Sequence, residues 1–169
     1  NNAALLARAE GRYEEAEALS MRAFRIDSKV LGAGHPATST DLNNLASLYQ
    51  ARGRFDEAEL MLKRALADRE KALGPDHPDV AQSLNNLARF HFQRWQFSIA
   101  ETGHKRALAI WEKHLGPRHP EIATSLGNLA DVYIALGRHA EAEALYRRAL
   151  DIRESALGPE HLHLATSLD

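Results

Sequence analysis

The chain has 169 residues, with 21 lysines and arginines against 23 aspartates and glutamates, and it contains no cysteine. The balanced charge and the lack of a basic block argue against nucleic acid as a partner, and the missing thiols rule out disulfide bonds and thiolate metal sites. The sequence shows no apolar run long enough to span a membrane, no signal peptide and no glycosylation acceptor, so we expect a cytoplasmic protein that does not bind membranes.

The sequence repeats itself at an offset of 42 residues, most clearly over residues 77–118. A fixed period of this length is the signature of a repeat array, in which each unit is a pair of helices stacked on its neighbours. We therefore expect one array, made of a partial first repeat (1–34), three whole repeats (35–76, 77–118 and 119–160) and the start of a fifth (161–169). The repeated positions include His35, His77, His119 and His161; Gly32, Gly74, Gly116 and Gly158; and Ala16, Ala58, Ala100 and Ala142.

The first half of the chain predicts two helix pairs in order. Residues 1–10 align with residues 43–52 and form the end of a first helix, and residues 13–31 form its partner, with Ala16, Leu19, Ala23, Phe24 and Ile26 on one apolar stripe. The next helix begins at Pro36, behind a capping His35, and ends at Gly53. Its partner covers residues 55–73 and stops at a Gly-Pro pair.

The second half repeats this order. We expect helices over residues 78–92, 97–115, 120–136 and 139–157, and residues 162–169 begin a further first helix. Both ends therefore have the pattern of half-helices, which indicates a piece of a longer array. We also expect that two copies can associate end to end through these half-helices.

The pattern resembles the tetratricopeptide repeat, whose spacing is held by Leu42, Leu45, Ala46, Tyr49, Gly53, Ala58, Leu62 and Ala65. The Leu-Asn-Asn-Leu-Ala segments at 42–46 and 84–88 and the Leu-Gly-Pro-x-His-Pro junctions at 73–78 and 115–120 are similar to the repeats of kinesin light chain and its bacterial relatives. This resemblance implies an all-α, right-handed superhelical solenoid of antiparallel helix pairs. Its concave groove would be lined mainly by the first helix of each pair.

The resemblance also implies a peptide-binding site. Asn44, Asn86 and Asn128, with Asn2 in the partial first helix, match groove asparagines that hold an extended peptide backbone in similar domains. An amide side chain donates and accepts hydrogen bonds, so it can pair with a peptide unit without selecting a sequence. The alternative is that these asparagines bond within or between helices.

Further residues are expected to line the groove, and they vary between repeats. Such variation on a constant scaffold suits selective recognition, although neutral drift on a solvated face also produces it. Domains that clamp a chaperone's C-terminal carboxylate place lysine or arginine on several first helices here. At these positions only Arg89 is basic, and Asp131 carries the opposite charge. We therefore do not expect a chaperone's C-terminus as the partner. The lining residues are Thr40, Asn43, Ser47 and Gln50; Gln82, Asn85, Arg89 and Gln93; and Thr124, Gly127 and Asp131.

The nine histidines do not predict a metal site. Those of the repeat junctions lie one to a junction, too far apart to share an ion, and we expect them to cap helices. No phosphate-binding loop or catalytic motif is present, so we expect neither a cofactor nor an enzyme.

The third repeat departs most from the pattern. Trp95 stands where the other turns have glycine, and His91 replaces a tyrosine. A left-handed tryptophan would cost about 1–2 kcal/mol. We therefore expect either an altered turn or a ring that gains packing, and an exposed ring could also anchor a partner.

These observations predict a scaffold that binds an extended peptide or a partner protein in its concave groove. Two alternatives stay open. The array could be the sensor or oligomerisation arm of a larger regulatory (STAND-type) ATPase, or it could be an architectural spacer.

Overall fold

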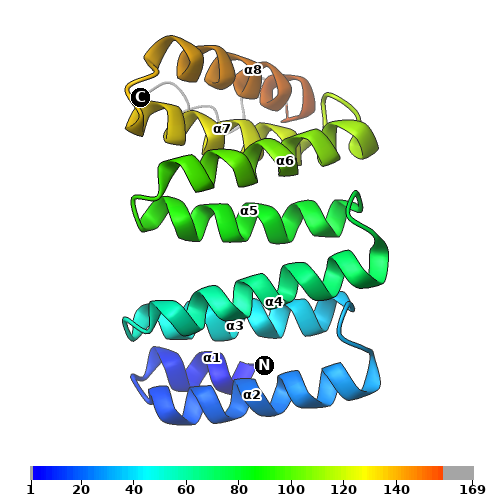
Figure 1. Ribbon diagram of the computed structural model, residues 1–169, viewed down its shortest axis with the longest axis vertical. Helices are drawn as coiled ribbons and strands as arrows, with labels where there is room; N and C mark the ends of the chain where they lie inside the picture. The colour runs from blue at the N-terminus through cyan, green and yellow to red at the C-terminus, as the bar shows by residue number, and fades with distance from the viewer. Residues whose placement is uncertain (1, 158–169) are drawn as a thin grey trace. The chain divides into compact units, whose positions relative to one another are not determined.

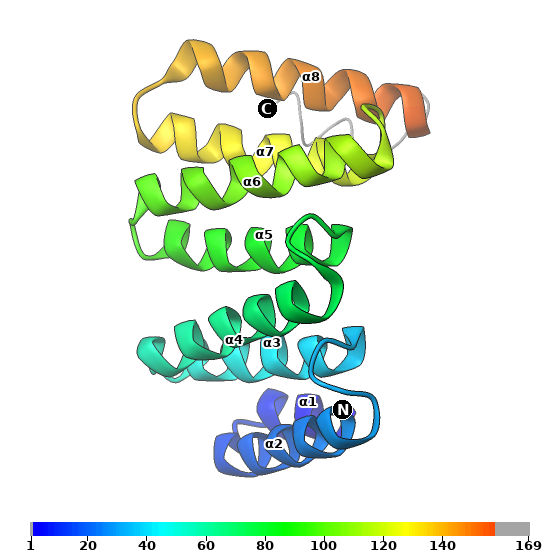
Figure 2. The same cartoon turned by 45° about the vertical axis from the view of Figure 1, so that its right-hand side comes forward.

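The computed structural model describes residues 2–157, and every regular element in that range is an α-helix (Figures 1 and 2). The helices expected within this range are all present, within a residue or two of their predicted ends, which confirms the all-α repeat architecture. The expected start of a further helix at residues 162–169, and His161, lie outside the described range. The helices are α1 (Asn2–Ala9), α2 (Tyr13–Val30), α3 (Pro36–Ala51), α4 (Phe55–Leu73), α5 (Pro78–Gln93), α6 (Phe97–Leu115), α7 (Pro120–Ala135) and α8 (His139–Leu157).

Histidine caps the N-terminus of α3, α5 and α7, as the sequence predicts. In each case the ring Nδ1 accepts a hydrogen bond from the backbone N–H two residues later. The distances from Nδ1 to the nitrogen are 3.2 Å at His35, 3.1 Å at His77 and 3.3 Å at His119. A proline follows each histidine and needs no hydrogen-bond partner at that position. The His-Pro pair is therefore a local signal that starts each first helix.

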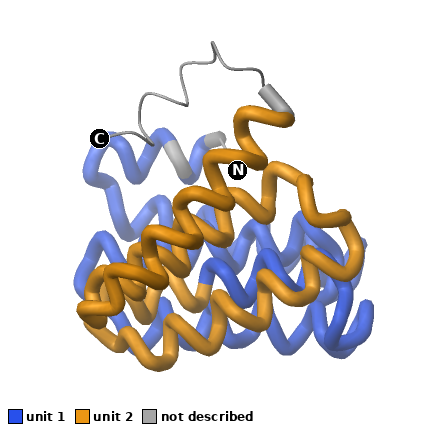
Figure 3. Tube along the Cα trace, turned by 90° about the horizontal axis from the view of Figure 1, so that it is seen from above, with its two compact units in different colours: residues 1–86 blue, residues 87–169 orange. Residues whose placement is uncertain are grey.

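The chain forms two compact units, residues 1–86 and residues 87–169, which are coloured separately in Figure 3. The boundary falls inside α5. In the first unit α1 packs on α2, α2 on α3, and α3 on α4. Leu42, Leu45 and Ala58 are completely buried between these helices. Burying one large aliphatic side chain stabilises a fold by about 1.5–3 kcal/mol, so the repeated leucines and alanines hold the helix pairs together.

The second unit is built in the same way. Here α6 packs on α7 and α7 on α8, around Ile122, Leu126 and Ala142, which are completely buried. The alanine shared by all second helices is at most 1 % exposed at Ala16, Ala58, Ala100 and Ala142. A small side chain at this position lets neighbouring helices approach closely.

One predicted core residue lies on the surface. Ile26 was expected in the packed stripe of α2, but it is 50 % exposed, and Val30 one turn later is 72 % exposed. Their half of α2 lies beyond the reach of α1, which has 8 residues where α3 has 16. The isoleucines at the same position of α6 and α8, Ile110 and Ile152, are 4 % exposed.

The turn before α6 has the same backbone as its counterparts, so the altered turn considered for Trp95 is wrong. Trp95 has φ 61°, beside 72° for Gly53 and 74° for Gly137. Its N–H bonds to the carbonyl of Phe92 at 2.9 Å, as the N–H of Gly53 bonds to Gln50 at 3.0 Å. Trp95 is the single non-glycine residue with positive φ in the described range. The fold therefore holds a tryptophan in a strained, left-handed conformation.

The linker before α3 passes very close to α4. A Cβ atom added to Gly34 would lie 2.1 Å from the Cβ of Ala72 and 3.1 Å from the carbonyl oxygen of Asp68. No side chain fits there without displacing backbone, so glycine is needed for the close approach. Beside this contact is an open hollow of about 520 Å³, lined by Leu31, Gly32, Ala33, Gly34, His35, Pro36, Asp68, Lys71, Ala72 and Leu73.

Candidate functional site

A stripe of polar side chains follows each first helix, with members three or four residues apart and therefore on one helix face. In α5 the stripe is Gln82, Asn86, Arg89 and Gln93, and each of these residues is partly or fully exposed. The asparagine is the member shared by all three stripes. The other stripes are Thr40, Asn44 and Ser47 in α3, and Thr124, Asn128 and Asp131 in α7.

In the first unit, hydrogen bonds hold the stripe in place. Ser47 accepts a bond of 3.2 Å from Nη1 of Arg8, which ties α3 to α1. The side-chain N–H of Gln82 donates to Oδ1 of Asn86 at 3.2 Å, one helical turn away. This bond fixes the rotation of the Asn86 amide and directs its NH₂ group away from Gln82. Thr40 instead donates to the carbonyl of Pro36 in its own helix at 2.9 Å.

In the second unit, second helices reach the stripe. The Tyr146 hydroxyl of α8 donates to the carboxylate of Asp131 in α7. Burial and this hydrogen bond raise the pKa of Tyr146 to about 12. At the same position of α6 lies His104, which is 1 % exposed, and its Nδ1 has no hydrogen-bond partner among the described residues. Burial, with a smaller effect of the Arg89 charge, lowers the pKa of His104 to about 4.

The asparagines that precede the stripe lie deeper in the fold. Asn85 is 8 % exposed, and Oδ1 of Asn43 is buried without a hydrogen-bond partner in the described structure. Gly127 takes this position in α7, where an added Cβ would meet only Nη2 of Arg153 at 4.0 Å. Gln50 is half-buried at the end of α3. Of the predicted lining residues, those on the stripe are therefore the more accessible. The side chain of Asn2 is not among those described.

Sequence reasoning missed Arg8, His104 and Tyr146, which contact or lie beside stripe residues. A signal was present for two of them. The position on the second helices that His104 and Tyr146 share is occupied by Ser20 in α2 and Leu62 in α4. It varies as the stripe does, whereas the neighbouring alanines do not vary.

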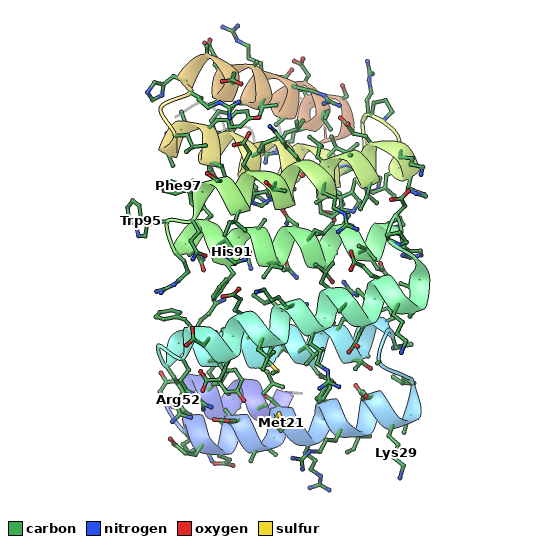
Figure 4. The ribbon with its side chains drawn as sticks, viewed as in Figure 1. Met21, Lys29, Arg52, His91, Trp95 and Phe97 are labelled. Carbon is green, nitrogen blue, oxygen red and sulfur yellow. The ribbon has the colours of Figure 1, made fainter. Side chains whose placement is uncertain are left out.

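An ionic cluster lies at the turn end of the first unit, near Arg52 (Figure 4). Glu17 of α2 accepts hydrogen bonds from Tyr49 at 3.1 Å, from Arg52 at 2.9 Å and from Arg54 at 2.8 Å. The guanidinium carbon of Arg54 also lies 4.4 Å from the centroid of the Tyr49 ring. Burial and the bond to Glu17 raise the pKa of Tyr49. Arg52 also pairs with Glu14 of α2 at 2.7 Å, so the cluster fastens α2 to the end of α3.

The second unit contains the equivalent cluster. Glu101 of α6 pairs with Lys105 at 2.6 Å and with Arg138 at 2.9 Å, and Arg138 covers the Tyr133 ring. Hydrogen bonds from Lys105 and then Arg138 lower the pKa of Glu101. The cluster fastens α6 to α7.

Within residues 2–157, no three histidine, aspartate or glutamate side chains gather closely enough to hold a metal ion. None of the described helices is long and apolar enough to cross a membrane.

A family model for the tetratricopeptide repeat matches residues 1–71, 90–155 and 121–169, which together make up most of the chain. The chain belongs to the tetratricopeptide repeat family. Its eight described helices are therefore the helix pairs of tetratricopeptide repeats, and the all-α solenoid class expected from the sequence is confirmed. No curated protein matches the sequence.

Solved structures of other proteins also resemble this one. BtubC (BKLC) from P. vanneervenii is 30% identical, with a TM-score of 0.77 over 94% of this chain and 63% of its own. TPR-like repeats assigned to a Podosopora anserina kinesin light chain are 30% identical, with a TM-score of 0.76 over 98% of this chain and 79% of theirs. A second crystal structure of those repeats, which carries a substitution, has a TM-score of 0.78 at the same identity. The tetratricopeptide repeats described here are therefore of the kinesin-light-chain-like type, and the chain spans less than two thirds of BtubC.

Proposed function

We propose that this chain is a scaffold that binds an extended segment of a partner protein along the polar stripes of its first helices. Tetratricopeptide repeats generally mediate protein–protein interaction, and families of this type are generally not enzymes. The core side chains of the repeats are buried, whereas the stripe residues are accessible and, apart from the shared asparagine, vary between repeats. The scaffold and the recognition surface are thus separate sets of residues.

The observation that carries the proposal is the asparagine that recurs at the same repeat position of α3, α5 and α7. Asn44, Asn86 and Asn128 are each half-buried, so their amide groups reach the surface on short side chains that lose little rotamer freedom. A side-chain amide can donate to a peptide carbonyl and accept from a peptide N–H at once. The bond from Gln82 holds the amide of Asn86 in one orientation, which lowers the entropy lost on binding.

The test is a titration of an unbiased peptide library against the purified chain, repeated for each hit with Asn44→Ala, Asn86→Ala and Asn128→Ala. A lost pair of hydrogen bonds weakens binding by about 1.5 kcal/mol, or roughly tenfold in Kd. The control is Arg147→Ala, because the side chain of Arg147 is 77 % exposed and pairs with Glu143 in its own helix. Peptides that bind all three asparagine variants as tightly as they bind the wild type would refute the proposal. They would favour the ATPase-arm or spacer interpretation, as would a library without hits.

End-to-end self-association through the terminal half-helices is a second proposal, and the exposed apolar face of α2, the partner of the first of them, supports it. Ile26 and Val30 are 50 % and 72 % exposed on neighbouring turns. A second copy that covered this face would remove both side chains from water. Sedimentation velocity at rising concentration should then show a growing mass, which Ile26→Glu with Val30→Glu should abolish. A single monomeric species at all concentrations would contradict it.

We also propose that the protein is located in the cytoplasm, as expected from the sequence. Imaging the tagged full-length protein in its own cells tests it.

A further inference from the structure

The linker between α2 and α3 differs in sequence from the linkers after α4 and α6. It has Ala33 and Gly34, where the other two have proline followed by aspartate (75–76) and proline followed by arginine (117–118). Gly34 lies so close to α4 that an added Cβ would be 2.1 Å from the Cβ of Ala72. This linker therefore has small side chains where the others have a proline ring and a charged group.

Two hydrogen bonds fix the course of this linker. The carbonyl of Gly32 accepts from the hydroxyl of Thr38 at 2.8 Å and from the backbone N–H of His35 at 3.3 Å. Thr38 is completely buried in α3, so the linker is anchored to a packed helix. The hollow beside the linker therefore has a wall of defined shape.

The wall of this hollow is largely apolar. Its volume is about 520 Å³, and it is lined by Leu31 at the end of α2 and Leu73 at the end of α4, which are 45 % and 39 % exposed. Ala33, Pro36 and Ala72 also line it. Small-molecule sites have volumes of about 300–1,000 Å³ and mostly apolar walls. An aliphatic ligand in the hollow would remove the exposed leucine surface from water.

The polar lining of the hollow favours an anionic group. Lys71 lines it and pairs with no other residue of the described chain. The Nδ1 of His35 accepts from the N–H of Ala37 at 3.2 Å, so the neutral ring carries its proton on Nε2 and offers a donor there. The one lining carboxylate, Asp68, already accepts from Nε of Arg64 at 3.5 Å. The hollow thus combines an unpaired cation and an imidazole donor with an apolar wall.

We propose that this hollow is a binding site for a small aliphatic carboxylate. The hydrocarbon chain lies against Leu31 and Leu73, and the carboxylate lies at Lys71 and the Nε2–H of His35. A hydrogen bond from a charged donor to a carboxylate is among the stronger ones. An inorganic phosphate would leave the leucines in water, and an aliphatic amine would meet the unpaired charge of Lys71. The site is separate from the polar stripes, because none of its lining residues belongs to them.

The experiment titrates octanoate into the isotope-labelled chain and follows the backbone amide signals by NMR. The signals of Ala33, Gly34 and Lys71 should shift in a saturable way, with a Kd on the order of 1 mM for a ligand of this size in an open site. Octanol and octylamine are the probes without a carboxylate, and they should bind at least about twofold more weakly. Affinity for octanoate should fall as salt is added, because the pair with Lys71 is partly exposed.

The variant Lys71→Gln isolates the charge. It should weaken octanoate binding about two- to fivefold and leave octanol binding unchanged. The matched control is Lys29→Gln, because Lys29 has the same repeat position on α2 and does not line the hollow. Figure 4 shows Lys29 at the end of α2, pointing away from α3 and α4. Both lysines are exposed, so both variants should fold, which circular dichroism checks.

Four results would each overturn the proposal. They are the absence of saturable shifts at the hollow residues, equal binding of octanol and octanoate, tighter binding of octylamine, and an unchanged affinity for octanoate in Lys71→Gln. Shifts confined to the side-chain amides of Asn44, Asn86 and Asn128 would place octanoate on the stripes and would also overturn it. None of these results bears on peptide binding by the stripes, which the asparagine variants test separately.

Discussion

The guanidinium carbon of Arg138 lies 3.9 Å from the centroid of the Tyr133 ring, while Nη1 of the same arginine bonds to Glu101 on the preceding second helix. Arg54 makes the same two contacts with Tyr49 and Glu17 in the other unit. One arginine thus covers a tyrosine of its own helix pair and binds the pair before it. The flat guanidinium group allows both, because it stacks through its face and donates through its edge.

We expect the two contacts of Arg138 to be coupled. Arg138→Gln, which introduces the residue found at position 96, should lower the midpoint of urea denaturation, and Glu101→Gln should do the same. The double variant should lose less than the sum of the two, because each single change removes the same ion pair. Additive losses would mean that the pair contributes nothing. Arg138→Lys separates the contributions, since lysine keeps the charge and loses the stacking.

Trp95→Gly should raise the free energy of unfolding by about 1 kcal/mol. A left-handed non-glycine residue costs about 1–2 kcal/mol, and the lost edge contact with Phe97 offsets part of the gain. Urea denaturation followed by circular dichroism measures the change. The matched control is Gly137→Ala, because Gly137 has φ 74° and a Cβ there would meet nothing within 4 Å. That variant should lose about 1 kcal/mol through the backbone alone.

His119→Ala should lower the free energy of unfolding by about 1 kcal/mol, the usual loss when a helix cap is removed. The Nδ1 of His119 accepts from the N–H of Glu121 at 3.3 Å, and alanine offers no acceptor. His119→Asn should keep most of the stability, since asparagine caps helices well. Equal losses in both variants would show that the histidine acts through packing rather than through its ring nitrogen.

Gly34→Ala should destabilise the chain by about 1–3 kcal/mol, the range for overpacking a close contact. The added methyl group would lie 2.1 Å from the Cβ of Ala72. Ala72→Gly removes that atom and should rescue part of the loss in the double variant. The rescue is partial because the carbonyl of Asp68 still lies 3.1 Å away and glycine weakens the helix. A double variant at least as unstable as the sum of the single changes would contradict this account.

His104 should make the stability depend on pH between about 4 and 6.5. Its pKa is about 4 in the folded chain against 6.5 for an ordinary histidine, so the unfolded chain binds more protons in this range. The free energy of unfolding therefore has its full value above pH 6.5. It falls as the pH drops toward 4, by roughly 3 kcal/mol in all.

The comparison of wild type with His104→Leu isolates this effect, because other groups titrate equally in both. Leucine is the residue that α4 has at this position. Urea denaturation at several pH values should give a shallower decline for the leucine variant below pH 6.5. His114→Leu is the control, since His114 is exposed on the same helix. Parallel pH profiles for wild type and His104→Leu would show that His104 is not buried in its neutral form.

The helix boundaries could be predicted because their signals are local. A His-Pro pair starts α3, α5 and α7, and glycine with its positive φ ends α4 and α6. Each signal acts within a few residues, and the 42-residue offset repeats it. The asparagine position on the stripe also followed from periodicity, since residues at helical spacing share a face. Peptide binding there is still a prediction.

The contacts to the stripe could not be predicted, because they join residues far apart in the sequence. Arg8 bonds to Ser47, and Tyr146 bonds to Asp131. Periodicity places a residue on a face of its own helix, but it does not say which side chain of the next helix reaches that face. Ile26 shows the same limit, because its position in the apolar stripe is clear and its exposure depends on how much of α2 the neighbouring helix covers.

The sequence alone determined the repeat, its helix pairs and their caps, because backbone conformation at a cap or turn depends on a few adjacent residues. The tertiary structure decided which individual side chains are buried and which contacts they make. Trp95 has the left-handed backbone conformation that glycine has in the other turns. The backbone hydrogen bonds of Trp95 and Gln96 hold it there, in the turn that the packed helices require. The tertiary structure also buried His104 beside Arg89 and left the Trp95 ring in water, because burial depends on which neighbours the folded helices bring within contact.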